Sequence, residues 1–112
     1  KDVQEQNERI AVMETNIDDC SGEILGYTQE KLFQNGALDV FYTPIFMKKN
    51  RPAYKLTVIC KKEDILKLQN IIFKETTTIG IRYHFEFRTE LERELIEIDT
   101  KYKENDKNNI VL

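Results

Sequence analysis

The chain has 112 residues, of which 40% are hydrophobic, which is enough for one domain with one core and too few for two. Its formal net charge of −3 argues against general nucleic-acid binding, which requires a basic face, although a local basic loop is enough for a single nucleotide. The two cysteines, Cys20 and Cys60, lie outside any CxxC or Cys/His spacing, which excludes a zinc ribbon and favours a reducing, cytoplasmic setting.

The two ends of the chain differ from its middle. Residues 1–8 are polar, and the chain closes on the apolar triplet Ile110-Val111-Leu112. No apolar stretch approaches the roughly 20 residues that cross a bilayer, so we expect no membrane partner. We expect residues 1–8 to be a polar linker to a missing N-terminal domain, and residues 9–112 to be one domain excised from a longer protein.

Residues 9–17 alternate in polarity as a half-buried strand does. At the exit of this strand the period of two places Glu14, Asn16 and Asp18 on one face, as a carboxylate-amide-carboxylate row. A helix is expected next, capped by Asp19 or Ser21. Gly36 suits the end of that helix because glycine readily adopts the left-handed conformation found there.

A second strand is expected over residues 37–47, where Pro44 cannot donate to a central ladder and so indicates an edge, a bulge or a bend. The basic turn Lys48-Lys49-Asn50-Arg51-Pro52 then leads to a third strand over residues 54–60, and a helix is expected over residues 63–74. The run Glu75-Thr76-Thr77-Thr78 ends that helix, because consecutive β-branched residues have poor helix propensity.

After Gly80 a regular alternation predicts a fourth strand over residues 81–88. A hairpin near Thr89-Glu90 is expected to return a fifth strand over residues 91–99, before a polar loop over residues 101–109. The order βαββαβ is the split βαβ arrangement of ferredoxin-like folds. We therefore predict an α+β, ferredoxin-like sandwich with an added C-terminal strand or hairpin.

The acidic strand exit and the basic turn carry opposite charges and together match the two halves of a metal-nucleotide. Mg²⁺ and Mn²⁺ prefer carboxylate and amide oxygens, whereas a triphosphate binds fixed cations and backbone N–H groups. Each segment also has a simpler interpretation. The carboxylates can cap the following helix, the lysines can form a solvated hairpin tip, and the threonine run can be only a helix end.

Four blocks of the sequence resemble, in order and spacing, the C-terminal domain of the LarC-type nickel insertases. The resemblance covers about residues 14–99, with Cys20 standing where Met is common and Ala53 where Gly is usual. The blocks are Glu14-Thr15-Asn16-Ile17-Asp18-Asp19, Gly36-Ala37-Leu38-Asp39-Val40-Phe41 with Thr43-Pro44-Ile45, Met47-Lys48-Lys49-Asn50-Arg51-Pro52, and Ile72-Phe73 with Glu75-Thr76-Thr77-Thr78-Ile79-Gly80-Ile81-Arg82.

The resemblance implies a CTP-dependent chelatase of the lyase class. Such an enzyme inserts nickel into a pyridinium bis-thiocarboxylate mononucleotide, in the synthesis of the nickel-pincer cofactor of lactate racemase, and hydrolyses CTP bound with Mg²⁺ or Mn²⁺. The C-terminal domain is then expected to hold the nucleotide, to form a homo-oligomer and to need the missing N-terminal domain for full activity. A non-catalytic regulatory or oligomerisation domain of the same fold is the alternative.

The candidate site residues follow from these segments. We expect the metal to be bound by Glu14, Asn16, Asp18 and Asp19. We expect the nucleotide to be bound by Lys48, Lys49, Asn50, Arg51, Thr76, Thr77, Thr78 and Arg82, with Lys49 and Arg51 stabilising the charge that develops on pyrophosphate. His84 is expected to be a surface strand residue, and the stripe of Tyr83, Phe85 and Phe87 to be core or an oligomer contact.

Overall fold

The structure is a computed structural model that describes residues 3–18 and 20–91. Its contacts divide the chain into two units. The larger, residues 9–87, contains both helices and most of the sheet. In the other, the described residues 3–8 and 88–91 are the outer ends of the first and last strands.

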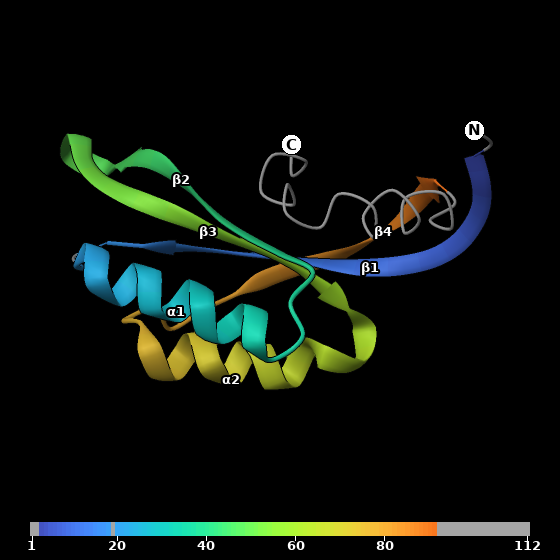
Figure 1. The fold of residues 1–112 in the computed structure, drawn as a ribbon. Helices are drawn as coiled ribbons and strands as arrows, with labels where there is room; N and C mark the ends of the chain where they lie inside the picture. The colour runs from blue at the N-terminus through green and yellow to red at the C-terminus, as the bar shows by residue number, and fades with distance from the viewer. Residues whose placement is uncertain (1–2, 19, 92–112) are drawn as a thin grey trace, which may run out of the picture. The chain divides into compact units, whose positions relative to one another are not determined.

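The described elements follow the order expected for a ferredoxin-like fold (Figure 1). They are β1 (Val3–Ile17), α1 (Gly22–Gln34), β2 (Asp39–Met47), β3 (Arg51–Lys61), α2 (Ile65–Glu75) and β4 (Arg82–Leu91), with short 3₁₀ turns η1 (Lys48–Asn50) before β3 and η2 (Lys62–Asp64) before α2. The strands form an antiparallel sheet in the order β2-β3-β1-β4, and both helices lie against one of its faces. The predicted βαββαβ fold is confirmed.

The core lies between the two helices and the face of the sheet that they cover. Alternate residues of β1 point into it, which confirms the expected period of two, and β3 contributes residues paired with them, as Met13 is with Val58. Its fully buried members are Ala11, Met13, Ile17, Leu32, Leu56, Val58, Cys60, Leu68 and Ile72.

Local signals explain where helix α1 begins and ends. The Ser21 hydroxyl accepts a hydrogen bond from the backbone N–H of Ile24 at 3.2 Å, so Ser21 is the N-cap. Asp19, the other expected cap, lies outside the described residues. Gly36 follows the helix with φ of 112°, the left-handed conformation for which glycine was expected.

Three predicted boundaries need correction. β1 extends back to Val3, well before the predicted start at residue 9, because the polar sequence of residues 3–8 gives no alternation from which a strand can be recognised. β3 begins at Arg51, so Arg51 and Pro52 lie in the strand and not in the turn. β4 continues through Thr89 and Glu90, so the hairpin expected there is wrong. Beyond Leu91, the predicted fifth strand and polar loop lie outside the described residues.

The expectation for Pro44 is confirmed, because β2 is an edge strand of the described sheet, and there a missing N–H costs no ladder bond. Pro44 pairs with Tyr54 of β3, and Phe46 pairs with Pro52. Among the described residues, no helix is long and apolar enough to span a membrane.

We predict that two neighbouring leucines of α2 differ sharply in their effect on stability. Leu68 is fully buried and Leu66 is 74% exposed. Leu68→Ala should lower the free energy of unfolding by about 2–5 kcal/mol, because it removes apolar contacts and leaves a cavity. Leu66→Ala is the matched control and should change it by less than about 0.5 kcal/mol. Urea denaturation measures both, and equal losses would show that the core is misplaced.

The thiols of Cys20 and Cys60 should differ in their reactivity. Burial raises the pKa of Cys60 to about 11, and the carboxylates of Asp64 and Glu63 add to the effect. A pKa raised in the folded state favours the protonated thiol, so this contribution to stability is present below pH 9 and is lost as the pH rises through 11. At pH 8 we expect Ellman's reagent to label the partly exposed Cys20 in the native protein, and Cys60 only after unfolding.

Candidate functional site

The acidic exit of β1 and the start of β3 meet in the folded chain. Asp18 directly follows β1, and its Oδ2 lies 2.9 Å from Nη2 of Arg51, the first residue of β3. The Arg51 side chain is 64% exposed and that of Asp18 30% exposed. Because ion pairs this exposed contribute little to stability, both groups are available to a ligand. The two segments of opposite charge predicted to converge are therefore side by side.

Glu14 forms a second charged centre on the sheet face opposite the helices. Its two carboxylate oxygens lie 3.2 Å from Nε of Arg82 and 3.7 Å from Nζ of Lys55. These contacts join β1 to a strand on each side of it. Arg82, expected on the polar face of its strand, does lie there.

The threonine run lies beside the acidic segment. The hydroxyl of Thr77 donates to the backbone carbonyl of Asp18 at 3.5 Å. The hydroxyl of Thr76 donates to the carbonyl of Ile72 and caps the end of α2, so the run also ends the helix as expected. A ligand at Asp18 would therefore have the Thr77 hydroxyl in the same neighbourhood as the Arg51 guanidinium.

Thr15 anchors this run to β1 and was given no role in the sequence analysis. Its side chain is buried at 2% exposure, and its hydroxyl lies 2.6 Å from the Thr78 hydroxyl and donates to the carbonyl of Gly80 at 2.7 Å. The sequence signal was available, because Thr15 is a polar residue on the apolar face of its strand. Buried hydroxyls at such positions need hydrogen-bond partners.

The tip of the β2–β3 hairpin carries the other basic residues. Lys49 and Asn50 have φ values of 59° and 60°, as a type I′ hairpin turn requires at its two central positions. Lys48, Lys49 and Asn50 are exposed, and within residues 3–18 and 20–91 no ion pair or side-chain hydrogen bond involves them. Among the described residues of the two charged segments, the contact that the structure shows is the one between Arg51, at the start of β3, and Asp18.

The strand geometry limits how the expected metal ligands can act. A strand advances about 3.3 Å per residue, so Glu14 lies roughly 10 Å along β1 from Ile17, the residue that precedes Asp18. The expected binding of one ion by both carboxylates stays a prediction. Asn16, which is exposed, is closer to Asp18 along the chain. Among the described residues, no three His, Cys, Asp or Glu side chains are grouped to hold a metal ion. Protein oxygens near Asp18 would therefore supply only part of a cation's shell.

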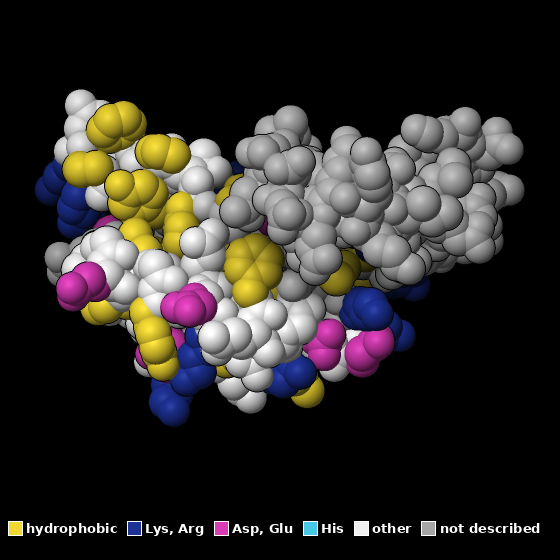
Figure 2. All heavy atoms as spheres, viewed as in Figure 1, with side chains coloured by type: hydrophobic (Ala, Val, Ile, Leu, Met, Phe, Trp, Pro, Cys, Tyr) yellow, Lys and Arg dark blue, Asp and Glu magenta, His cyan; other side chains and the backbone are white. Residues whose placement is uncertain are grey.

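A hollow of about 570 Å³ opens next to Asp18. It lies between the end of β1, the start of α1 and the outer ends of β2 and β3. Hydrophobic side chains gather over this end of the hairpin in Figure 2, with Lys and Arg at their margin. Its lining is Ile17, Asp18, Cys20, Ser21, Pro44, Ile45, Phe46, Pro52, Ala53 and Tyr54. The sequence analysis did not identify this pocket.

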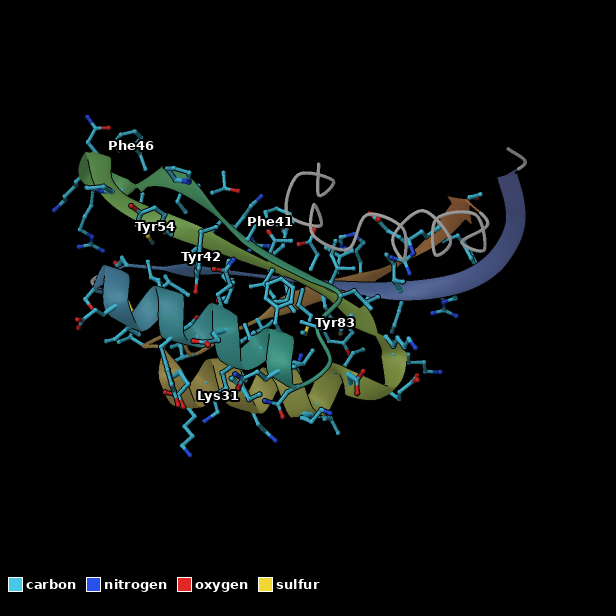
Figure 3. The ribbon with its side chains drawn as sticks, viewed as in Figure 1. Lys31, Phe41, Tyr42, Phe46, Tyr54 and Tyr83 are labelled. Carbon is cyan, nitrogen blue, oxygen red and sulfur yellow. The ribbon has the colours of Figure 1, made fainter. Side chains whose placement is uncertain are left out.

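Tyr42 supports the pocket from the core side. Its hydroxyl donates to the carbonyl of Leu25 in α1 at 2.7 Å, and its ring meets that of Tyr54 edge to face at 6.3 Å between centroids (Figure 3). Burial raises the pKa of Tyr42 to about 12, with the charge on Cys20 as the second cause. The phenol therefore stays protonated at neutral pH and acts as a hydrogen-bond donor, not as a base.

The remaining polar and aromatic predictions concern β4. His84 is exposed and lies 3.0 Å from Glu86, as expected for a surface strand residue. Phe85 packs against the core, which confirms part of the aromatic stripe. Tyr83 and Phe87 are 49% and 72% exposed, and their expected part in an oligomer contact stays a prediction.

We predict that Thr15 stabilises the position of the threonine run. Thr15→Val keeps the shape of the side chain but removes the hydroxyl, and should lower the free energy of unfolding by about 0.5–1.5 kcal/mol. Thr57→Val is the matched control, since Thr57 is buried at 4% exposure in the same sheet and is not bonded to this run. Urea denaturation measures both variants. Equal losses would contradict the anchoring role of Thr15.

The comparisons with known proteins agree on one family. The profile of the nickel insertion protein family matches residues 1–109. The chain is 65% identical over 91 residues to the pyridinium-3,5-bisthiocarboxylic acid mononucleotide nickel insertion protein of Alkaliphilus metalliredigens, which covers 81% of this chain and 22% of that protein. The chain thus spans less than a quarter of the length of this curated relative.

Two solved structures support the fold. LarC2, described as the C-terminal domain of a cyclometallase involved in the synthesis of the NPN cofactor of lactate racemase, superposes with a TM-score of 0.70 and 49% identity, over 72% of this chain and 56% of that one. A PII-like signalling protein from Thermus thermophilus superposes with a TM-score of 0.53 and 13% identity, over 79% and 95%. At that identity the second likeness concerns the fold alone.

Proposed function

The chain belongs to the nickel insertion protein family, and we propose that it is the part of a nickel insertase that binds CTP together with Mg²⁺ or Mn²⁺. The whole enzyme would insert nickel into the pyridinium bis-thiocarboxylate mononucleotide during nickel-pincer cofactor synthesis, with CTP hydrolysis and with an N-terminal domain as partner. The observation that carries the nucleotide-binding role is the convergence of Asp18, Arg51 and Thr77 at one place.

The ion pairs explain why a cation should accompany the nucleotide. Arg51 is paired with Asp18, and Arg82 and Lys55 are paired with Glu14. A triphosphate that approached Arg51 alone would come close to the negative charge of Asp18. A divalent cation at Asp18 neutralises that charge and releases the guanidinium for bidentate phosphate binding. Cation and nucleotide are therefore expected to strengthen each other's binding.

The remaining candidate residues have distinct proposed roles. Arg51 holds a fixed position at the start of β3, whereas Lys48, Lys49 and Asn50 lie on the exposed turn and can move toward a phosphate. Arg51 and Lys49 would stabilise the charge that develops on pyrophosphate. The hydroxyls of Thr76, Thr77 and Thr78, with Arg82, would bind the other phosphate oxygens. The bound cation would supply charge neutralisation at the phosphates, with Asn16, Asp18 and Asp19 as protein ligands and Glu14 as a positioning residue.

We predict cation-dependent binding of CTP that becomes weaker when the Arg51 side chain is removed. Isothermal titration of the chain with CTP and Mn²⁺ should show binding that is stronger than for ATP or GTP. Arg51→Ala and Arg82→Ala should each weaken it by about 10- to 150-fold, the equivalent of one charge-assisted contact. Lys67→Ala is the matched control, because Lys67 is an exposed cation of α2 that is paired with Asp64. Absence of binding to every nucleotide would favour the non-catalytic regulatory or oligomerisation domain.

We further predict that Asp18 sets the cation requirement. In wild-type protein the CTP affinity should be much higher with Mn²⁺ than with EDTA. Asp18→Asn should narrow this ratio, because metal-free CTP no longer meets a carboxylate at Arg51, while the affinity with Mn²⁺ falls. An Asp64→Asn variant serves as the control, since Asp64 pairs with Lys67 away from this contact. An unchanged ratio in Asp18→Asn would contradict the coupling.

A further inference from the structure

Large apolar side chains remain exposed along α2 and β4, far from the charged segments in the sequence. They are Leu66 and Phe73 of α2 and Tyr83 and Phe87 of β4, and each is at least 42% exposed. Single exposed apolar residues are normal on a protein surface, whereas a group of them on neighbouring elements marks a surface that binds another surface. We call these four residues the α2–β4 patch.

The two members on α2 lie on the side of the helix that faces away from α1. Leu66 and Phe73 are seven residues apart, which is about two helical turns, so their side chains share one side. Glu75 contacts Lys31 of α1 and so marks the opposite side. At about 100° per residue, Phe73 and Glu75 point roughly 160° apart around the helix. The patch is therefore directed away from the contact between the helices.

The two members on β4 lie on the helix side of the sheet. Phe85, which alternates with them along the strand, packs against the core, and alternate residues of a strand share a face. β4 is an edge strand of the described sheet, and α2 runs in the direction opposite to it (Figure 1). Leu66, at the start of α2, and Phe87, near the end of β4, are thus at the same end of the layer.

The start of β1 leads to this same end of the layer. The guanidinium of Arg9 lies 4.5 Å from the centroid of the Phe85 ring, and Arg82 contacts Glu14, so β1 followed backwards runs toward Phe87. The matched region is 22% of the curated relative, and the solved structure of 49% identity is described as a C-terminal domain. In a protein with that arrangement, the N-terminal part joins β1 beside the patch.

The size of the patch favours a part of the same polypeptide over a second copy of the chain. A standard interface between separate proteins has about 20–30 residues on each side, far more than the patch supplies. A covalently joined part needs a smaller surface, because the linkage gives it an effective concentration on the order of mM. Aromatic side chains such as Phe73, Tyr83 and Phe87 are typical of the centre of such contacts.

We propose that the α2–β4 patch docks an apolar surface of the N-terminal part of the full-length nickel insertase. The inference rests on the proposed function for the presence of that partner and adds the surface that binds it. β4 and β2 are opposite edges of the described sheet. The N-terminal part can therefore dock at the patch and leave the β2–β3 hairpin open to a ligand.

The test compares the chain alone with a full-length protein, the relative of 65% identity in which the matched region is exchanged for this chain. Leu66→Cys and Phe87→Cys place thiols at exposed positions of the patch. Tyr27→Cys, at a site 52% exposed on α1, is the matched control. The reaction of each thiol with N-ethylmaleimide is followed by mass spectrometry. Cys60 serves as the folding reference because it is buried.

Leu66→Cys and Phe87→Cys should react about 10-fold or more slowly in the full-length protein, which corresponds to a docking free energy of about 1.4 kcal/mol. Tyr27→Cys should react at the same rate in both proteins. Equal rates at all three positions overturn the inference, and so does equal slowing at Tyr27→Cys, because the shielding is then not confined to the patch.

Two further results separate this inference from its alternatives. Slower reaction of the patch thiols in the chain alone as its concentration rises overturns the inference, because a second copy then covers the patch. CTP titration of Phe87→Cys should match that of the unmodified chain, since Phe87 is not part of the proposed nucleotide site. Loss of docking with CTP binding intact refutes the inference alone, whereas docking without any CTP binding refutes the nucleotide-binding proposal alone.

Discussion

The antiparallel pairing of β1 with β3 is the constraint on which the site depends. Its register places Ile17 opposite Tyr54 and Asn16 opposite Lys55, so the exit of β1 lies beside the start of β3. A shift by one residue would turn Glu14 and Asn16 toward the helices and bring Met13 and Thr15 to the other face. The buried side of β1 therefore fixes the register, and the register fixes which charged groups meet. The contact between Asp18 and Arg51 is a consequence of core packing and does not itself hold the strands together.

Different residues therefore determine the stability of the fold and the binding of a ligand. Leu56 and Val58 of β3 are completely buried, and their apolar contacts stabilise the sheet. The Arg51 side chain is mostly exposed, so its ion pair with Asp18 adds little to stability. Thr15 is the exception, because one buried hydroxyl joins the sheet to the threonine run next to Asp18. Substitutions at the charged groups can therefore change ligand binding in a chain that remains folded.

Much of this arrangement could be predicted from the sequence, for identifiable reasons. Alternation of polarity located the strands, and Pro44 indicated an edge, a bulge or a bend, of which the structure shows an edge strand. The extension of β1 to Val3 could not be found, because polar residues carry no hydrophobic period. The hairpin predicted near Thr89 and Glu90 was also wrong, because β4 continues through both residues. Alternation reports which face a residue is on but not where strand pairing stops.

The candidate site was predictable in its charges but not in its shape. Their opposite charges indicated that the acidic exit of β1 and the basic turn would converge, and Asp18 and Arg51, one from each segment, are in contact. The row of expected metal ligands was less informative, because a strand advances about 3.3 Å per residue and so places Glu14 farther from Asp18 than Asn16 is. The pocket was not predicted, because Phe46 and Tyr54 belong to different strands. The β2–β3 register brings them together by pairing Phe46 with Pro52 and Pro44 with Tyr54.

The fold itself does not determine the ligand, because ferredoxin-like sheets carry unrelated functions. In this chain the edge hairpin extends an apolar surface up to the contact between Asp18 and Arg51. Pro52 belongs to that surface and directly follows Arg51, so a single strand start positions both the guanidinium and the apolar surface. A ligand with a ring and phosphates would then bind both features at once. The ring would supply affinity that is insensitive to salt, whereas the phosphates would depend on the cation and on ionic strength.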